Sequence, residues 1–159
     1  MKYIKAVQKQ LSEIENHITK ATTENKAVSK SNIAWHLDHS LKVVNGVAGL
    51  LQQSDPEGFK PNFSAMRLYC FTFNYIPRGK GKSPKAVLPP EIITAEDLKK
   101  QVNYAKSELQ HVIDLPKTAN FKHPYFGQLN KQQTLRFLKL HTEHHLKIVR
   151  DILNVRNTQ

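Results

Sequence analysis

Histidines are the residues in this sequence whose type and spacing could do chemistry. Of the eight histidines, five fall in two short clusters, His36 and His39, then His141, His144 and His145. Imidazole nitrogens bind divalent transition metals, and two histidines at positions i and i+4 of one helix can chelate a single ion. The pair at 141 and 145 has that spacing. The sequence therefore predicts a metal site.

The helical periodicity of the last segment indicates which of these imidazoles face the core. At ~100° per residue, His141 and His145 share an arc of ~100–120° with Leu138 and Ile152, whereas His144 lies at the flank of that arc. A buried polar side chain without a partner costs roughly 1–3 kcal/mol. A lone core histidine is usually satisfied by a carbonyl or a water, but two in one turn favour a shared metal ion.

A third ligand is expected from another helix. His36 lies ~50° from the middle of the apolar arc of the segment 32–53, and His39 lies ~110° from it. We therefore predict His36 as the third ligand, with His39 in reserve. His39 and His144 are the candidates for a supporting or proton-transferring role. Zinc, nickel or iron fits such a ligand set, and the spacing does not choose among them.

Four segments with helical periodicity must position these side chains, and none alternates as a strand would. They span residues 1–20, 32–53, 94–114 and 130–155. Residues 63–75 are aromatic-rich and could form a further short helix. The fold class predicted is all-α: a single domain, 1–159, forming a four-helix bundle. Long loops are expected between the second and third helices and, at 117–129, between the third and fourth.

A family resemblance adds to this interpretation. The stretch from His141 to Ile148, together with the preceding residues 123–129, resembles the last loop and helix of the DinB-like superfamily. Residues 33–41 resemble a branch of that superfamily with no assigned function. The similarity covers most of the chain. It implies a four-helix bundle, often dimeric, in which one histidine of the second helix and two of the last helix bind a divalent metal.

The resemblance places the last-helix pair at His141 and His145, and the second-helix ligand aligns at either His36 or His39. It also implies thiol-dependent transferase chemistry in some relatives, in which a low-molecular-weight thiol attacks an electrophile. A homodimer is a further expectation.

Three imidazoles leave coordination positions open, which is typical of catalytic rather than structural metal sites. We therefore expect a metal-dependent enzyme that acts on a small-molecule substrate, as a thiol-dependent transferase or a hydrolase. The sequence singles out no acid or base for the catalytic role. The alternative is a protein that binds a metal or small ligand without turnover.

Charge and its distribution argue against nucleic-acid and nucleotide binding as the function. Twenty-four Lys and Arg against thirteen Asp and Glu give a net charge of +11, but the basic residues are spread from Lys2 to Arg156. Nucleic-acid binding usually needs them concentrated on one face, which argues against that function. The basic loop at 78–82 could attract an anion, but Gly81-Lys82-Ser83 lacks the rest of a phosphate-loop pattern.

Two further features concern the compartment. No apolar run is long enough to span a membrane, and the first residues do not resemble a secretory signal. Cys70 is the only cysteine, which excludes an internal disulfide and fits a reducing compartment. We expect a cytoplasmic protein with Cys70 buried as a small apolar side chain.

Overall fold

The computed structural model describes residues 2–79 and 83–154, and the protein is mostly helical with one small sheet. The helices are α1 (Lys2–His17), α2 (Ile33–Gln52), α3 (Ala65–Phe73), α4 (Ala95–Asp114) and α5 (Lys131–Asn154). Two short 3₁₀ helices, η1 (Ile18–Lys20) and η2 (Lys85–Val87), and two strands, β1 (Asn120–His123) and β2 (Gly127–Asn130), complete the described elements.

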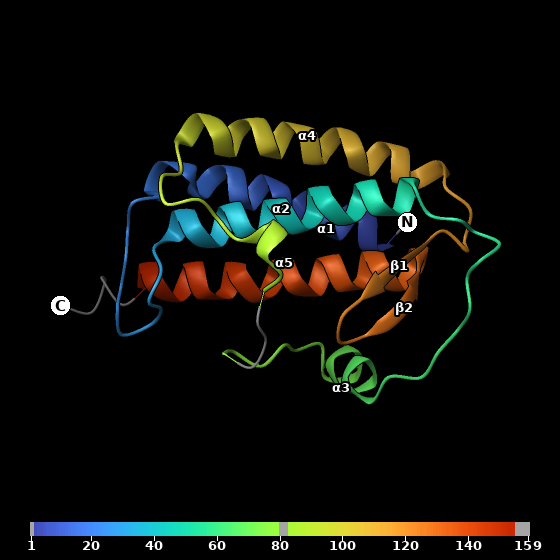
Figure 1. Ribbon diagram of the computed structural model, residues 1–159. Coiled ribbons are helices and arrows are strands. Elements are labelled where there is room, and N and C mark those ends of the chain that lie inside the picture. The colour runs from blue at the N-terminus through green and yellow to red at the C-terminus, as the bar shows by residue number, and fades with distance from the viewer. Residues whose placement is uncertain (1, 80–82, 155–159) are drawn as a thin grey trace.

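The four long helices lie side by side (Figure 1). Helix α2 packs against α4 and α5, and α1 packs against the same two helices. The helical segments predicted at 1–20, 32–53, 94–114 and 130–155 match α1 with η1, α2, α4 and α5, with residues 1 and 155 outside the described range. The short helix expected within 63–75 is α3, which stands outside the four long helices.

Capping residues fix where the site-bearing helix begins. The side chain of Asn32 accepts a hydrogen bond from the backbone N–H of Trp35, which satisfies one of the free donors at the start of α2. Helix α4 starts in the same way, with Thr94 accepting from the N–H of Asp97 as its sequence predicts. The cap on α2 places His36 and His39 in its first two turns.

The two-stranded sheet is a departure from the all-α prediction. Strands β1 and β2 pair antiparallel, with His123 opposite Gly127, in the segment expected to be a loop. Gly127 has φ +70, a conformation that glycine adopts without strain. The ring Nδ1 of His123 also accepts hydrogen bonds from the backbone N–H groups of Tyr125 and Phe126 and so closes the turn. Each strand has a single large apolar residue, Phe121 or Leu129, so no alternation marks either strand in the sequence.

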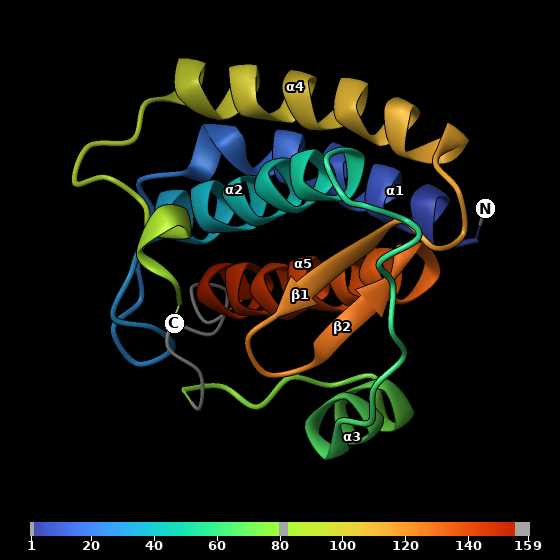
Figure 2. The same cartoon turned by 45° about the vertical axis from the view of Figure 1, so that its right-hand side comes forward.

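Other elements enclose the region where α2 faces α5. The hairpin packs against the N-terminal part of α5, and α3 lies beside the hairpin (Figure 2). Arg67 of α3 secures that arrangement by donating to the carbonyl oxygens of Phe126 and Gln128. On the other side, η2 packs against α2. No helix in the described part of the chain is long and apolar enough to cross a membrane.

Candidate metal centre

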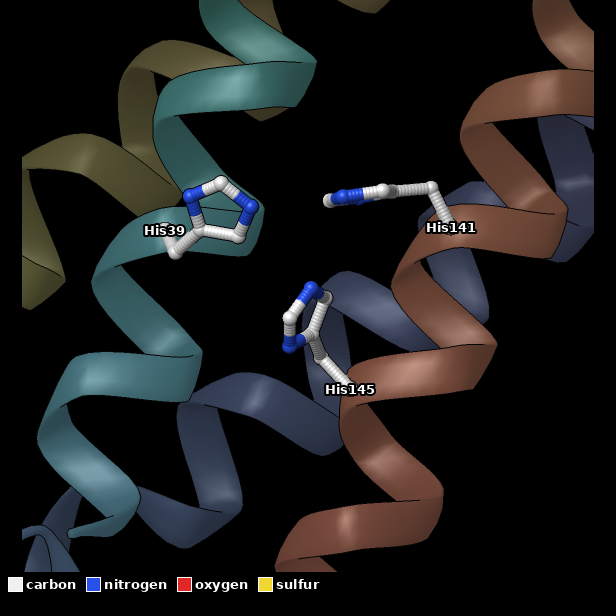
Figure 3. Close-up of side chains that lie close together, drawn as sticks. All are labelled: His39, His141 and His145. Atoms are coloured by element: carbon white, nitrogen blue, oxygen red, sulfur yellow. The ribbon is translucent and has the colours of Figure 1, made fainter. Parts of the chain in front are cut away.

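Three histidines from two helices converge in the space between α2 and α5 (Figure 3). His39, His141 and His145 each offer one ligand nitrogen, and these three nitrogens all lie within 4.8 Å of one another. The ring centroids are 5.2 Å apart for His39 and His141, 4.8 Å for His39 and His145, and 4.7 Å for the pair on α5. The i, i+4 spacing on α5 sets the last of these distances.

The backbone of a distant segment orients the first of these rings. His39 Nδ1 lies 2.8 Å from the carbonyl oxygen of Val87, at the end of η2. A carbonyl can only accept, so Nδ1 carries the proton and Nε2 keeps its lone pair. The indole of Trp35 stacks on the same ring at 5.1 Å between centroids and 20° between planes. The hydrogen bond fixes the tautomer, and both contacts hold the ring in the orientation that a metal ligand requires.

A second imidazole orients His145. Its Nδ1 lies 3.1 Å from Nδ1 of His36, whose Nε2 lies 2.9 Å from the hydroxyl oxygen of Ser29. The remaining nitrogen of His145 points into the space between the other two rings (Figure 3). For that nitrogen to act as a ligand, Nδ1 of His145 must donate to His36, and Nε2 of His36 must donate to Ser29. His36 therefore occupies the place of a residue that orients a ligand.

The third ring has an unsatisfied nitrogen. His141 Nδ1 is buried, and no group within residues 2–79 and 83–154 forms a hydrogen bond with it. Buried polar atoms in native proteins are nearly always paired, because leaving one unpaired costs about 1–3 kcal/mol. A divalent ion shared with His39 and His145 accounts for an imidazole held in this position. The residues present thus fit a metal.

Burial keeps these imidazoles in the form that binds metal. Loss of hydration lowers the pKa of His141 and of His145 well below the usual value of 6.5, and the neighbouring imidazoles lower both further. Burial also lowers the pKa of His39, against the opposing effect of its hydrogen bond to Val87. All three are neutral at pH 7, and neutral imidazole is the ligand form.

The histidines open into a cavity of about 940 Å³. Residues of α2, α5, the hairpin and the segment after α3 line it, including Trp35, His144, Phe121, Phe137 and Arg78. The lining is mostly apolar and aromatic, with all but one of its imidazoles, His123 of the hairpin, where α2 and α5 face each other. Ligand sites in proteins commonly combine an apolar cavity with a few convergent polar groups.

Residues 3–152 match the family described as "Protein of unknown function (DUF1569)". The chain belongs to this family. Comparison with curated proteins and with solved structures gave no match.

The DUF1569 structure brings together His39, His141 and His145, whereas the sequence predicted His36 in place of His39. The helical wheel assumed that α2 has one apolar face. In the structure α2 is covered on several sides: η2 reaches His39, α4 reaches Asp38 through Gln101, and Ser29 reaches His36. His36, Asp38 and His39 are therefore all buried. Distance from the apolar arc therefore could not show which imidazole faces α5.

The structure of this DUF1569 protein also gives the positions of three other residues for which the sequence made predictions. His144, expected at the flank, is hydrogen-bonded to the backbone of Ile76 and packs edge-on against His145. His123 was expected in a loop or at the surface, but it ends β1 and its ring packs against Phe137. Cys70 is buried, as predicted.

Three contributors to the site were missed. Trp35 adjoins a histidine in sequence and could have been found by its i, i+4 spacing to His39. The carbonyl of Val87 and the hydroxyl of Ser29 reach the site only through the fold, and nothing in their local sequence marks them. Residues 80–82 of the predicted basic loop, and with them most of the phosphate-loop fragment, lie outside the described residues.

Proposed function

We propose that the protein is a metal-dependent enzyme of the thiol-dependent transferase or hydrolase type, in which His39, His141 and His145 hold one divalent transition metal. The observation that carries the proposal is the convergence of three ligand nitrogens within 4.8 Å, one of the imidazoles having a buried nitrogen without a hydrogen bond. A metal bound there with open positions would supply Lewis-acid chemistry to a small-molecule substrate.

The chain's own residues supply position and a limited means of moving protons. The backbone carbonyl of Val87 orients His39, and the side chain of His36 orients His145, each through a hydrogen bond to the ring. No carboxylate is among the described residues that line the cavity. His36, His123 and His144 are the imidazoles that line the cavity and are not in the proposed ligand set. His36 has its pKa lowered to about 4 by burial and is a weak base, which suits it to orienting His145.

The resemblance to the DinB-like superfamily supports the same proposal at the level of the fold. We include in it a four-helix bundle made of α1, α2, α4 and α5, and a homodimer. Light scattering on purified protein would give the oligomeric state directly. A mass of one chain would remove the dimer from the proposal without affecting the metal centre.

Metal content of tag-free protein tests the centre itself. We expect about one zinc, nickel or iron per chain, and loss of that metal in His39→Ala and in His141→Ala. His36→Ala should keep the metal with an affinity about 10–100-fold lower, because it removes a supporting hydrogen bond rather than a ligand. His111→Ala is the matched control, since His111 is exposed on α4 and should change nothing.

Two results would contradict this assignment. A wild-type protein that binds no metal after incubation with zinc, nickel or iron salts would remove the centre. Loss of metal in His36→Ala with retention in His39→Ala would exchange the roles of these two residues. If metal is bound but neither thiol transfer nor ester hydrolysis by the wild type exceeds that of His141→Ala, the protein is a metal-binding protein without catalysis.

A further inference from the structure

The cavity continues along α2 well beyond the histidines. His39, Val43, Gly46 and Leu50 all line it, and their spacing of i, i+4, i+7 and i+11 places them on one face of the helix. At 1.5 Å of rise per residue, Gly46 lies ~10 Å and Leu50 ~16 Å along the helix axis from His39. The cavity is thus an elongated trough with the three imidazoles toward one end.

The walls of the trough away from the histidines include large apolar side chains beside a few polar ones, such as Asn45 and Gln101. Phe137, one turn before His141 on α5, stacks with Phe121 of the hairpin at 6.3 Å between centroids and 25° between planes. At the rim, Leu50 and Tyr104 are 51% and 54% exposed. Exposed apolar side chains in a concave site gain free energy when an apolar ligand covers them. A fully polar substrate would leave this length of trough unused.

The charged side chains of the trough are all basic. Lys42, Arg78 and Lys122 line it, and no Asp or Glu does among the residues the structure describes. Lys42 follows His39 by three residues and is held by an ion pair with the buried carboxylate of Asp38, at 2.9 Å. Arg78 is held in the same manner by an ion pair with Asp151. Neither carboxylate faces the cavity.

The two anchored cations belong to the histidine end of the trough. Lys42 is nearly one helical turn from His39. Arg78, whose ion pair with Asp151 is partly exposed, follows by two residues Ile76, whose backbone is hydrogen-bonded to His144. The carboxylates of Asp38 and Asp151 offset part of this charge, but of these groups only the two cations line the cavity. A ligand at this end therefore meets cationic side chains, which favours an anion over a cation.

We propose that the substrate of this site is an elongated anionic amphiphile. Its negatively charged, reacting end lies at the histidines, and its alkyl or aryl-alkyl chain lies along α2 toward Leu50 and Tyr104. This assignment rests on the metal-dependent function proposed above and adds the class of molecule on which it acts.

Two glycines of α2 provide a matched test. A Cβ added at Gly46 or at Gly49 would meet no atom within 4 Å, so both positions have room for a side chain. Gly46 lines the trough, whereas Gly49 does not. Replacing a helical glycine also favours the helix, which works against loss of fold in either variant. Gly46→Leu should fill the trough ~10 Å from His39 and leave the histidines untouched.

The experiment measures binding of decanoate, butyrate and decylamine to the zinc-loaded protein by calorimetry, with the fluorescence of Trp35, the single tryptophan, as a second readout. Each buried methylene is worth about fourfold in affinity. Even with partial burial, we expect decanoate to bind at least ~30-fold more tightly than butyrate. The basic lining should make decylamine at least ~10-fold weaker than decanoate. Gly46→Leu should lower the affinity for decanoate ~10-fold without changing the zinc content. Gly49→Leu should change neither the affinity nor the zinc content.

The outcomes separate this inference from the proposed function. If the protein binds zinc but binds decanoate no more tightly than butyrate, or no more tightly than decylamine, the substrate is not an anionic amphiphile. An unchanged decanoate affinity in Gly46→Leu would overturn its placement along α2. Selective decanoate binding by a protein that holds no metal would support the trough while removing the metal-dependent function.

Discussion

The carbonyl oxygen of Val87 decides which nitrogen of His39 faces the centre. The acceptor comes from a segment 48 residues away, and it requires a proton on Nδ1. His145 receives the corresponding support from the side chain of His36. His141 has no such support in the described part of the chain, and its Nδ1 is left buried and unpaired. The three imidazoles thus differ in how firmly the protein alone holds them.

This difference predicts the tautomer of His39 before any metal is added. In metal-free protein at pH 7.5, His39 should be in the Nδ1–H form, because only that form pairs with Val87. Long-range nitrogen–proton correlation spectra of histidine-labelled protein measure the tautomer, and His39→Gln assigns the signal. An Nε2–H pattern for His39 would show that the bond to Val87 does not form and that the ligand nitrogen is misassigned.

His123 predicts how stability changes with pH. Burial lowers its pKa to about 4, from an ordinary value of 6.5 in the unfolded chain. Between these values the unfolded state binds more protons than the folded state, so the free energy of unfolding falls as pH falls from 6.5 to about 4. Urea unfolding of metal-free protein across that range should show the loss. Other buried histidines with lowered pKa values, such as His36, act in the same direction. His123→Asn keeps a side-chain acceptor for the turn and should make the slope shallower by the share of one histidine, whereas an unchanged slope would exclude a contribution from His123.

At the scale of elements, the segment between α3 and α4 is tied to the site-bearing helices at both its ends. His144 of α5 bonds the backbone of Ile76, and His39 and Lys42 of α2 bond the carbonyl oxygens of Val87 and Leu88. The sequence predicted a long loop between the second and third helices here, with basic residues at 78–82. The hydrogen bonds that fix it use backbone carbonyls, which every residue possesses, so sequence could not locate them.

The ion pair beneath this segment should contribute to stability. Asp38 is buried and accepts from Gln101 of α4 at 2.7 Å, while its other oxygen lies 2.9 Å from Lys42, which in turn reaches Leu88. Asp38→Asn should lower the free energy of unfolding by about 2 kcal/mol, because it leaves the partly buried ammonium without its carboxylate.

A pair on the surface of α4 provides the control. Glu96 and Lys100 are 2.8 Å apart but highly exposed, so Glu96→Gln should cost less than about 0.5 kcal/mol. Chemical denaturation of the two variants beside the wild type makes the comparison. Equal losses would mean that burial of Asp38 adds nothing to its ion pair.

Sequence predicted elements better than it predicted their relative orientation. The long helices were found because each has apolar residues three or four apart, such as Val7, Leu11 and Ile14 on α1, which are fully buried. The His141/His145 pair was found because both residues share one helix and one face. The choice between His36 and His39 depends on how α2 is rotated relative to α5 and on what η2 covers. Those are properties of packing between distant segments.

At the scale of the whole molecule, a metal held at the proposed centre would join two of the packed helices. His39 belongs to α2, and the other two ligands belong to α5, which pack against each other. A ligand that binds only the folded state adds RT ln(1 + [L]/Kd) to stability, about 2.7 kcal/mol at 100 times Kd. For a chain of this size, that corresponds to a rise in Tm of roughly 5–11 °C.

Thermal unfolding with and without zinc therefore tests the centre independently of turnover. We expect zinc to raise the Tm of the wild type and a chelator to reverse that increase. His39→Ala should show no increase, because the two remaining imidazoles lie on one helix and cannot bridge α2 to α5. His111→Ala should keep the full rise, since that exposed side chain lies on α4, away from the ligands. The same rise in His39→Ala as in wild type would mean that zinc stabilises the protein by binding elsewhere. The convergence of the three histidines would then be a feature of packing alone.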